Sequence, residues 1–307
     1  MSLFSLIAVF IIEQFKPLDY RRVVGEPLTV WADFVESRFN AGTRAHGVAA
    51  WCLAVLLPVA GLAVLYYGLQ ALHPLLAWLL SVGVLYLTMG FRQFSHHYTE
   101  IQLALRMGDL DLARERLAGW LGHASHGMSA EEISARAIEG ALAASHRHVF
   151  AVLLCFVLLP GPCGALLYRL SLIVRDRWTR PEAAEHREFS IFAQQTFAII
   201  DWLPLRATAA AFAVVGDFED AAYCWRTQPA QWPDQDLGIV LAAGAGALGV
   251  QLGKQLVQGG TLEEQAELGL GDPADVDFMQ AAVGLVWRAT VLWMLLLFLL
   301  GLASLVG

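Results

Sequence analysis

The sequence predicts an all-α, polytopic membrane protein whose helices cross a lipid bilayer several times. Apolar residues make up 57% of its 307 residues, and charged residues make up only 16%. A soluble domain would have difficulty hiding that much apolar surface from water. Several uncharged runs also approach the roughly 20 residues that a helix needs to cross the hydrocarbon core. We therefore expect four or five apolar segments in a single membrane domain that covers residues 1–307.

The first apolar segment, residues 2–14, is short for a membrane span. Met1 to Phe4 contain no basic residue, whereas a cleaved signal peptide carries basic residues before its apolar core. We therefore expect an uncleaved helix that lies in the membrane or just crosses it.

The next two apolar segments predict a helical hairpin. Residues 48–72 contain no charged residue and are long enough to cross a bilayer. His73 and Pro74 then break the helix, and the shorter apolar run 74–90 can return through the membrane. This hairpin is the clearest membrane element in the sequence.

A fourth segment, residues 149–174, is long enough to span but is interrupted by Pro160, Gly161 and Pro162. Proline removes a helical hydrogen bond and clashes with the preceding turn, so the helix must break or kink there. A plain kink, a short re-entrant hairpin and a substrate-facing break all remain open. The last segment, 289–306, is uncharged, and Trp287 and Arg288 precede it where interfacial anchors belong.

Two polar stretches, 91–147 and 175–278, carry the charge patterns of solvated helices. Gly108 and Asp109 lead into one such helix, because acids at a helix start complement its dipole. Basic residues flank the 48–90 hairpin on both sides, at Arg21, Arg22, Arg38, Arg44, Arg92 and Arg106. The positive-inside rule therefore places these flanks in the cytoplasm, and we expect a multi-pass protein of the bacterial inner membrane.

Charge and motifs argue against several classes of ligand. The net charge of -8 and the scattered basic residues argue against a nucleic-acid partner. The nine histidines include no HExxH pair, and we expect no metal site. Residues 244–249 match GxGxxG without a preceding strand or a following acid, so a dinucleotide site is not indicated. The spacing of Gly249 and Gly253 favours close helix packing instead.

The strongest candidate site is the pair Asp201 and Arg206 within the apolar stretch 197–215. An acid and a base in a membrane segment are costly, so they are expected to pair or to face a cavity. The alternative is structural, with Asp201 capping a helix that Pro204 begins. Arg92 is a further candidate, on a polar stripe that any half-exposed helix would also show.

Several motifs resemble the AmpE and CobD/CbiB superfamily. They are Leu159–Arg169 (LPGPCGALLYR), Asp201–Arg206 (DWLPLR), Gly216–Glu219 (GDFE) with Trp225, Gly108–Arg114 (GDLDLAR) and Ala137–Glu139 (AIE). The resemblance covers most of the chain and is most specific within these motifs.

The CbiB branch implies an enzyme. Its members are similar to adenosylcobinamide-phosphate synthases, which join an aminopropanol unit to a corrinoid carboxylate using ATP and magnesium. In that branch the tyrosine motif continues into NTLDSM, whereas here it continues into residues 171–176. Its paired aspartates fall at Phe197 and Ala198, and its GRDT is matched only by residues 122–125. Three acidic positions are therefore missing.

The AmpE branch implies a regulatory protein linked to β-lactamase induction, and Asp201 resembles that branch. We therefore expect an AmpE-like inner-membrane sensor without ligase activity and without a cofactor. Arg169, Tyr168, Asp201, Arg206 and Arg92 would bind an anionic small molecule at the membrane face. Membrane lipids are the other expected partner, and a homo-oligomer is possible. The alternatives are a CobD/CbiB enzyme using ATP and magnesium, and a transporter, although no inverted repeat is found in the apolar segments.

Overall fold

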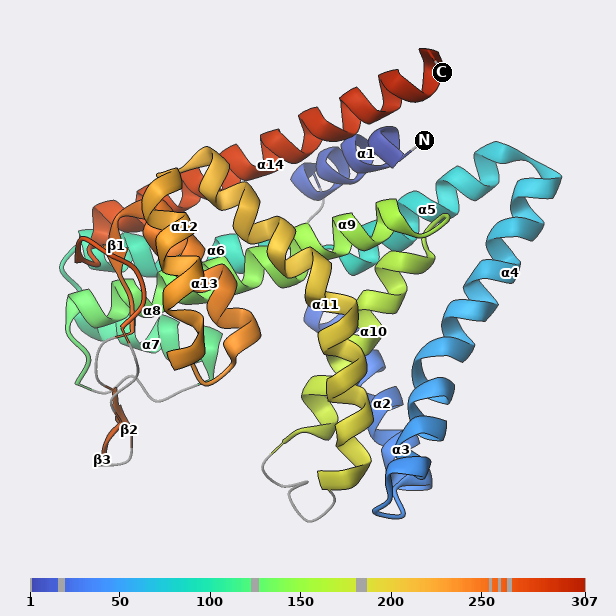
Figure 1. Ribbon diagram of the computed structural model, residues 1–307, viewed down its shortest axis with the longest axis horizontal. Helices are drawn as coiled ribbons and strands as arrows, with labels where there is room; N and C mark the ends of the chain where they lie inside the picture. The colour runs from blue at the N-terminus through green and yellow to red at the C-terminus, as the bar shows by residue number, and fades with distance from the viewer. Residues whose placement is uncertain are drawn as a thin grey trace. The chain divides into compact units, whose positions relative to one another are not determined.

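The computed structural model describes residues 2–15, 20–122, 127–180, 187–253, 256–258, 261–263 and 267–306. Helices dominate this part of the chain, and the strands are only two or three residues long (Figure 1). The predicted all-α fold class is confirmed. The chain divides into two compact units: unit 1 holds Met1–Gly90 and His148–Pro204, and unit 2 holds Phe91–Arg147 and Leu205–Gly307.

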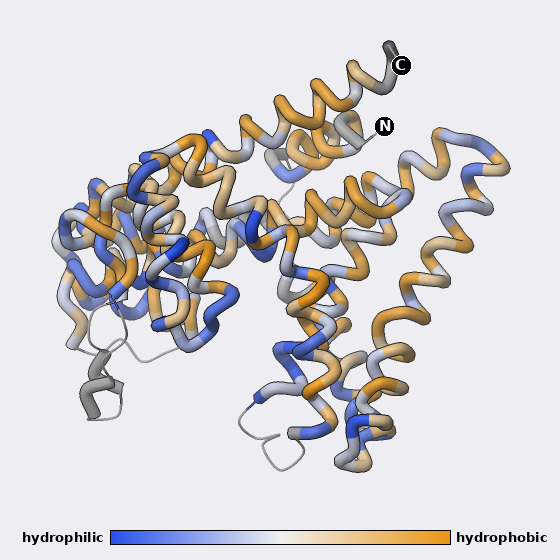
Figure 2. Tube along the Cα trace, in the orientation of Figure 1, coloured by the Kyte–Doolittle hydropathy of each residue, from blue (hydrophilic) through white to orange (hydrophobic). Residues whose placement is uncertain are grey.

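Four helices among the described residues are long and apolar enough to cross a membrane. They are Arg44–Leu72, Ala130–Leu158, Glu188–Val215 and Val276–Ala303. The chain is therefore a multi-pass membrane protein, as predicted. Figure 2 shows long apolar runs along α4 (Leu57–Leu72) and along the C-terminal part of α14 (Val276–Val306).

Two of these long helices overlap the stretches that we expected to be polar. Ala130–Leu158 begins inside the stretch 91–147, and Glu188–Val215 lies entirely inside 175–278. Both helices carry charged residues, which interrupted the uncharged runs by which the sequence was divided. Asp201 and Arg206 lie in the second of them and lowered its apparent apolar length.

Unit 1 is built from α1 (Ser2–Phe15), η1 (Arg21–Gly25), α2 (Glu26–Phe39), α3 (Arg44–Trp51), η2 (Cys52–Leu56), α4, α5 (Pro74–Thr88), α9 (Ala151–Leu158), α10 (Cys163–Trp178) and the first part of α11 (Arg187–Val215). The predicted hairpin is present, because α4 ends at Leu72 and α5 begins at Pro74. The His73 ring accepts a hydrogen bond from the Leu75 N–H at 3.2 Å and so caps α5.

The segment 149–174 is broken around Pro160, as the prolines predicted, and the break is a helical reversal. Helix α9 ends at Leu158 and α10 runs from Cys163 to Trp178. Gly161 has a φ of 64°, a left-handed conformation that favours glycine. A Cβ at Gly164 would lie 1.9 Å from the Cys155 carbonyl oxygen, so only glycine allows the two helices to approach this closely.

The core of unit 1 joins α2, α3, α10 and α11 through aromatic side chains. The rings of Trp178 and Phe189 lie 4.7 Å apart, and the Trp178 indole donates to the Ala32 carbonyl at 3.2 Å. Gly47 faces the Phe189 carbonyl, where a Cβ would approach to 2.2 Å. Close packing and the indole hydrogen bond hold this core together.

Unit 2 contains α6 (Phe91–Arg106), α7 (Leu110–Leu121), α8 (Ala130–Ser145), the last part of α11, α12 (Phe218–Thr227), η5 (Pro229–Gln231), α13 (Gln235–Leu248) and α14. The π-helical segment η3 (His146–Phe150) continues α8 into α9. Asp109 accepts from the Leu112 N–H at 3.0 Å, which confirms the predicted start of α7. Ser129 and Glu132 form a capping box at α8.

Two glycines of the glycine-rich segment of unit 2 lie in close contact with neighbouring helices. In α13, a Cβ at Gly244 would lie 2.7 Å from Leu142, and one at Gly246 would lie 2.6 Å from the Asp220 carbonyl oxygen. Gly249 instead ends the helix with a φ of 66°. The prediction that the spacing of Gly249 and Gly253 serves helix packing is therefore wrong, and the close contacts fall at Gly244 and Gly246 instead.

The strands of unit 2 follow α13. Strands β1 (Val250–Gln251) and β4 (Asp272–Pro273) pair in parallel, and β2 (Leu256–Gln258) pairs with β3 (Thr261–Glu263) in antiparallel fashion. The final helix, α14, begins at Val276, well before the predicted residue 289. Its first turns make a polar contact with α6, because Tyr98 donates to the Met279 carbonyl at 2.8 Å.

Candidate functional site

A buried arginine forms the polar centre of unit 1. Arg169 lies in the middle of α10 with 1% of its surface exposed. Its Nε donates to the Thr88 carbonyl oxygen at 3.1 Å, and its Nη2 donates to the same oxygen and lies 3.0 Å from His148 Nδ1. The guanidinium carbon also lies 4.8 Å from the centre of the Tyr20 ring. No carboxylate among the described residues forms an ion pair with Arg169.

The surroundings of Arg169 explain how a cation is tolerated there. Thr88 is the last residue of α5, where unpaired carbonyls give the helix end a partial negative charge. The face of Tyr20 supplies a cation–π contact. Burial raises the pKa of the Tyr20 hydroxyl, an effect that the charge of Arg169 partly opposes. Arg169 therefore connects α5, η3 and the residue preceding η1.

Two of these contacts come from π-helical segments or their immediate neighbours. His148 lies within η3, and Tyr20 immediately precedes η1. Such segments are uncommon in proteins and frequently occur at functional sites. A sequence carries no simple signal for them, so neither His148 nor Tyr20 was among the predicted site residues.

Tyr168 and Asp201, two further predicted site residues, also lie in unit 1. Both are buried: Tyr168 is on α10 and its ring centre lies 5.6 Å from that of Phe197 on α11. Asp201 lies one turn further along α11 and interacts electrostatically with Cys155 of α9. Helix α11 continues through Pro204 without a break, so the alternative in which Asp201 caps a new helix at Pro204 is wrong.

The remaining predicted residues belong to unit 2. Arg206 is half-buried on α11 beyond the unit boundary, and Arg92 lies on α6 with its side chain outside the described residues. Of the predicted GRDT counterpart, residues 122–125, the last three also fall outside the described part. That the five residues share one binding site stays a prediction.

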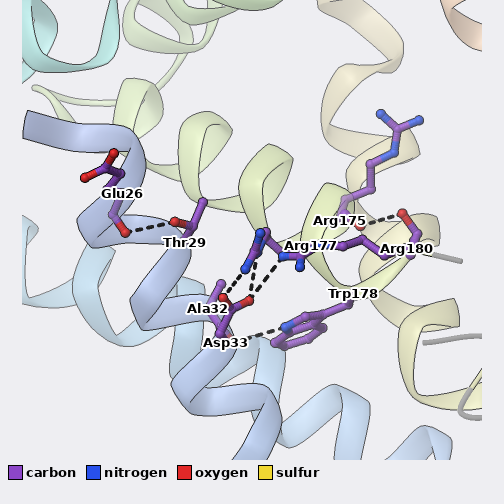
Figure 3. Close-up of polar contacts among 9 residues, drawn as sticks. Glu26, Thr29, Ala32, Asp33, Arg175, Arg177, Trp178 and Arg180 are labelled. Atoms are coloured by element: carbon purple, nitrogen blue, oxygen red, sulfur yellow. Dashed lines mark hydrogen bonds and ion pairs between the residues drawn. The ribbon is translucent and has the colours of Figure 1, made fainter. Parts of the chain in front are cut away.

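A second basic group, which the sequence analysis missed, lies at the end of α10 (Figure 3). Arg177 donates hydrogen bonds to both carboxylate oxygens of Asp33 on α2, and its Nε lies 2.8 Å from Oδ1. Arg180 Nη2 lies 3.3 Å from the same Oδ1. Arg175 lies 3.4 Å from Asp176 and 5.1 Å from the centre of the Phe197 ring.

These arginines are accessible, unlike Arg169. The side chain of Arg177 is 29% exposed and that of Asp33 is 40% exposed. We call Arg175, Arg177 and Arg180 the arginine cluster. Its signal in the sequence was three arginines within six residues at the end of an apolar run.

Comparison with known proteins identifies the family. The family model described as CobD/Cbib protein matches residues 21–286. This chain belongs to the CobD/CbiB family. It is 36% identical over 270 residues to "Cobalamin biosynthesis protein CobD" of Stutzerimonas stutzeri, covering 87% of each chain. It is 35% identical to the CobD of Chromobacterium violaceum over 80% of this chain and 73% of that one.

More distant relatives carry the same kind of name. The CbiB of Salmonella typhimurium is 23% identical over 74% of this chain and 73% of its own length. No solved structure gives a significant match.

These findings overturn the predicted function of this CobD/CbiB family member. The prediction of an AmpE-like regulator of β-lactamase induction is wrong, and so is the preference for a non-enzyme, because its relatives are named for cobalamin biosynthesis. The prediction relied on three missing acids. Sequence identity over most of the chain is stronger evidence for the family than the residue types at three positions. At one of these positions, the Phe197 ring packs on Tyr168 and faces Arg175, so a residue other than an acid is accommodated there.

Proposed function

We propose that this protein is a cobalamin-biosynthesis enzyme of the inner membrane that forms an amide in the manner of an adenosylcobinamide-phosphate synthase. It would join the amine of an aminopropanol unit to a corrinoid carboxylate at the expense of ATP. The observation that carries the proposal is the 36% identity to a cobalamin-biosynthesis CobD protein across 87% of both chains. The motifs Leu159–Arg169 and Asp201–Arg206 point to the same family.

The proposed reaction needs residues that hold anionic groups. A carboxylate is a poor electrophile, and ATP would supply the phosphoryl group that makes its oxygen a leaving group. The amine then attacks the carbonyl carbon, the C–O bond to the phosphorylated oxygen breaks, and the amine loses a proton as the amide forms. Substrate carboxylate and phosphate groups all carry negative charge.

The arginine cluster fits this requirement better than Arg169. Guanidinium groups bind carboxylates and phosphates through two parallel hydrogen bonds. Arg177 already shows this geometry with Asp33, and its partial exposure lets an anion reach it. Arg169 is 1% exposed and has Thr88 and His148 as partners, so we assign it a positioning role.

Magnesium would accompany ATP in such a reaction. Among the described residues, no group of three or more His, Cys, Asp or Glu side chains gathers as a metal site. Mg²⁺ is usually held by one or two carboxylates together with substrate phosphates and water. The described side chains thus offer no preformed cage, and we name no magnesium ligand and derive no step through the metal.

Complementation tests the proposed function directly. The protein would be expressed in a bacterium that lacks its own CbiB and needs cobalamin for growth, supplied with the corrinoid carboxylate precursor. We expect growth without added cobalamin and, with purified protein, ATP-dependent consumption of the amine. A protein that is well expressed in the membrane yet supports neither would refute the proposal.

A further inference from the structure

A cavity of about 400 Å³ lies within unit 1 where α9 reverses into α10. It is lined by Ser5 of α1, by Tyr66 and Gln70 of α4, by Pro74, Ala77, Trp78 and Ser81 of α5, and by residues 156–161. That volume suits a small molecule or the headgroup of a lipid. We call it the reversal cavity.

The reversal leaves backbone carbonyls without their usual donors. In a continuous helix, the Phe156 and Leu158 carbonyls would accept from the residues four positions later, which are Pro160 and Pro162. Proline has no N–H to donate. Among the described residues, no other donor is found for these two carbonyl oxygens, and both residues line the reversal cavity or its rim. Non-helical backbone at membrane depth is tolerated only where protein or a polar cavity shields it.

The charge character of the reversal cavity favours a cation that donates hydrogen bonds. Its lining includes no acidic and no basic side chain. The carbonyls at the end of α9 give it a partial negative charge. Tyr66 and Trp78 add aromatic rings, and rings of this kind attract ammonium groups. The Tyr66 ring is held in place by close contact with Gly161, where a Cβ would lie 2.8 Å from it.

The shape of the reversal cavity suits a headgroup with an apolar remainder. Its floor is buried, formed by Ser5, Ala77, Ser81 and Phe156. Its rim is exposed at Gln70, Pro74 and Leu158. An occupant can therefore place a small polar end among the buried hydroxyls and leave its remainder outside the cavity.

We propose that the reversal cavity binds a primary ammonium group, carried either by the ethanolamine headgroup of a membrane lipid or by a free amino alcohol. The ammonium donates to the Phe156 and Leu158 carbonyls and packs against Tyr66 and Trp78. A lipid headgroup site would be independent of the proposed amide formation, because it needs no arginine and no ATP. A site for a free amino alcohol rests on the proposed function, in which an aminopropanol unit supplies the amine.

Binding by the full-length protein in a neutral maltoside detergent tests the proposal. The probes are short-chain phosphatidylethanolamine, phosphatidylglycerol with the same acyl chains, and free ethanolamine, measured by native mass spectrometry and by retention of labelled ligand. We expect the protein to retain an ethanolamine-bearing probe at least about tenfold more than phosphatidylglycerol. Selective retention of the lipid identifies a headgroup site, and binding of free ethanolamine identifies a site for a small amine; both support the proposal.

Matched variants make the test specific to the reversal cavity. Tyr66→Leu removes a ring and Ala77→Leu fills the floor, and each should abolish the preference. Tyr67→Leu and Ala71→Leu change the same residue types outside the cavity lining and should keep it. Tyr66→Phe keeps the ring and should bind nearly as wild type. If the wild type shows no preference for ethanolamine, or if Tyr67→Leu loses it as fully as Tyr66→Leu, the proposal is overturned.

Discussion

Arg169 and Arg177 lie about two turns apart on the same helix, α10, yet their surroundings differ in kind. Arg169 is 1% exposed and is held by a helix-end carbonyl, an imidazole and an aromatic ring. Arg177 is 29% exposed and is held by a carboxylate. The comparison teaches that a buried polar residue in an apolar segment can serve to hold neighbouring helices together. The accessible arginine at the helix end is the better candidate for binding an anionic ligand.

The largest expected effect is on stability, at Arg169. In Arg169→Met, the Thr88 carbonyl and His148 lose their charged partner, and leaving a buried hydrogen-bonding group unsatisfied typically costs about 1–3 kcal/mol for each group. Unfolding of the purified protein in mixed micelles would measure this loss. Arg169→Lys, the matched control, keeps the charge but not the forked geometry, so it should recover only part of the stability. A stable Arg169→Met protein that had lost ligand binding alone would reverse the roles assigned to the two arginines.

Replacing Arg177 should lower the catalytic efficiency of the proposed reaction. Arg177→Ala is expected to lower kcat/KM for the phosphate-bearing substrate or ATP by roughly 10- to 100-fold, the usual range for losing one charge-assisted contact. Amide formation by purified protein at varied substrate concentration is the measurement. Arg38→Ala alters an exposed arginine of α2 that lies over Phe34, and it should leave kcat/KM unchanged. Equal losses in both variants would point to general surface charge instead of a binding site.

The sequence predicted the helical membrane fold well because long apolar runs have few alternatives in a bilayer. The 44–72 and 74–88 hairpin follows from hydropathy and from His73 and Pro74 alone. Helix α11 was missed as a membrane segment because Asp201 and Arg206 interrupt its apolar run. Proline at 160 predicted a break, yet the reversal depends on the tertiary approach of Gly164 to Cys155.

The site was harder to predict than the fold. Arg169 and Tyr168 were found through the family motif. Whether an arginine has a structural role or can bind a ligand depends on its burial, and burial is set by neighbours that are distant in the sequence. Thr88 and His148 reach Arg169 from positions 81 and 21 residues away. Asp33 lies 144 residues from Arg177, so no local pattern could pair them.

A smaller effect is expected from Tyr20 at alkaline pH. Burial raises the pKa of its hydroxyl above the usual value near 10, so the folded protein favours the neutral form. The resulting stability is present below about pH 10 and is lost as the pH rises toward the folded-state pKa. Tyr20→Phe cannot ionise and should lose less stability between about pH 10 and pH 11 than the wild type. Unfolding midpoints at both pH values measure the difference, and parallel losses in the two proteins would show that Tyr20 contributes nothing to it.

The smallest effect concerns the stability that Asp33 gives to the arginine cluster. Exposed ion pairs contribute only about 0–1 kcal/mol and are screened by salt. Asp33→Asn should therefore barely change the unfolding midpoint, and the small difference should vanish at about 1 M salt. The same variant removes the carboxylate that competes with an incoming anion for Arg177. If the arginine cluster binds substrate, the KM for the anionic substrate should fall at low salt, whereas a purely structural pair would leave KM unchanged.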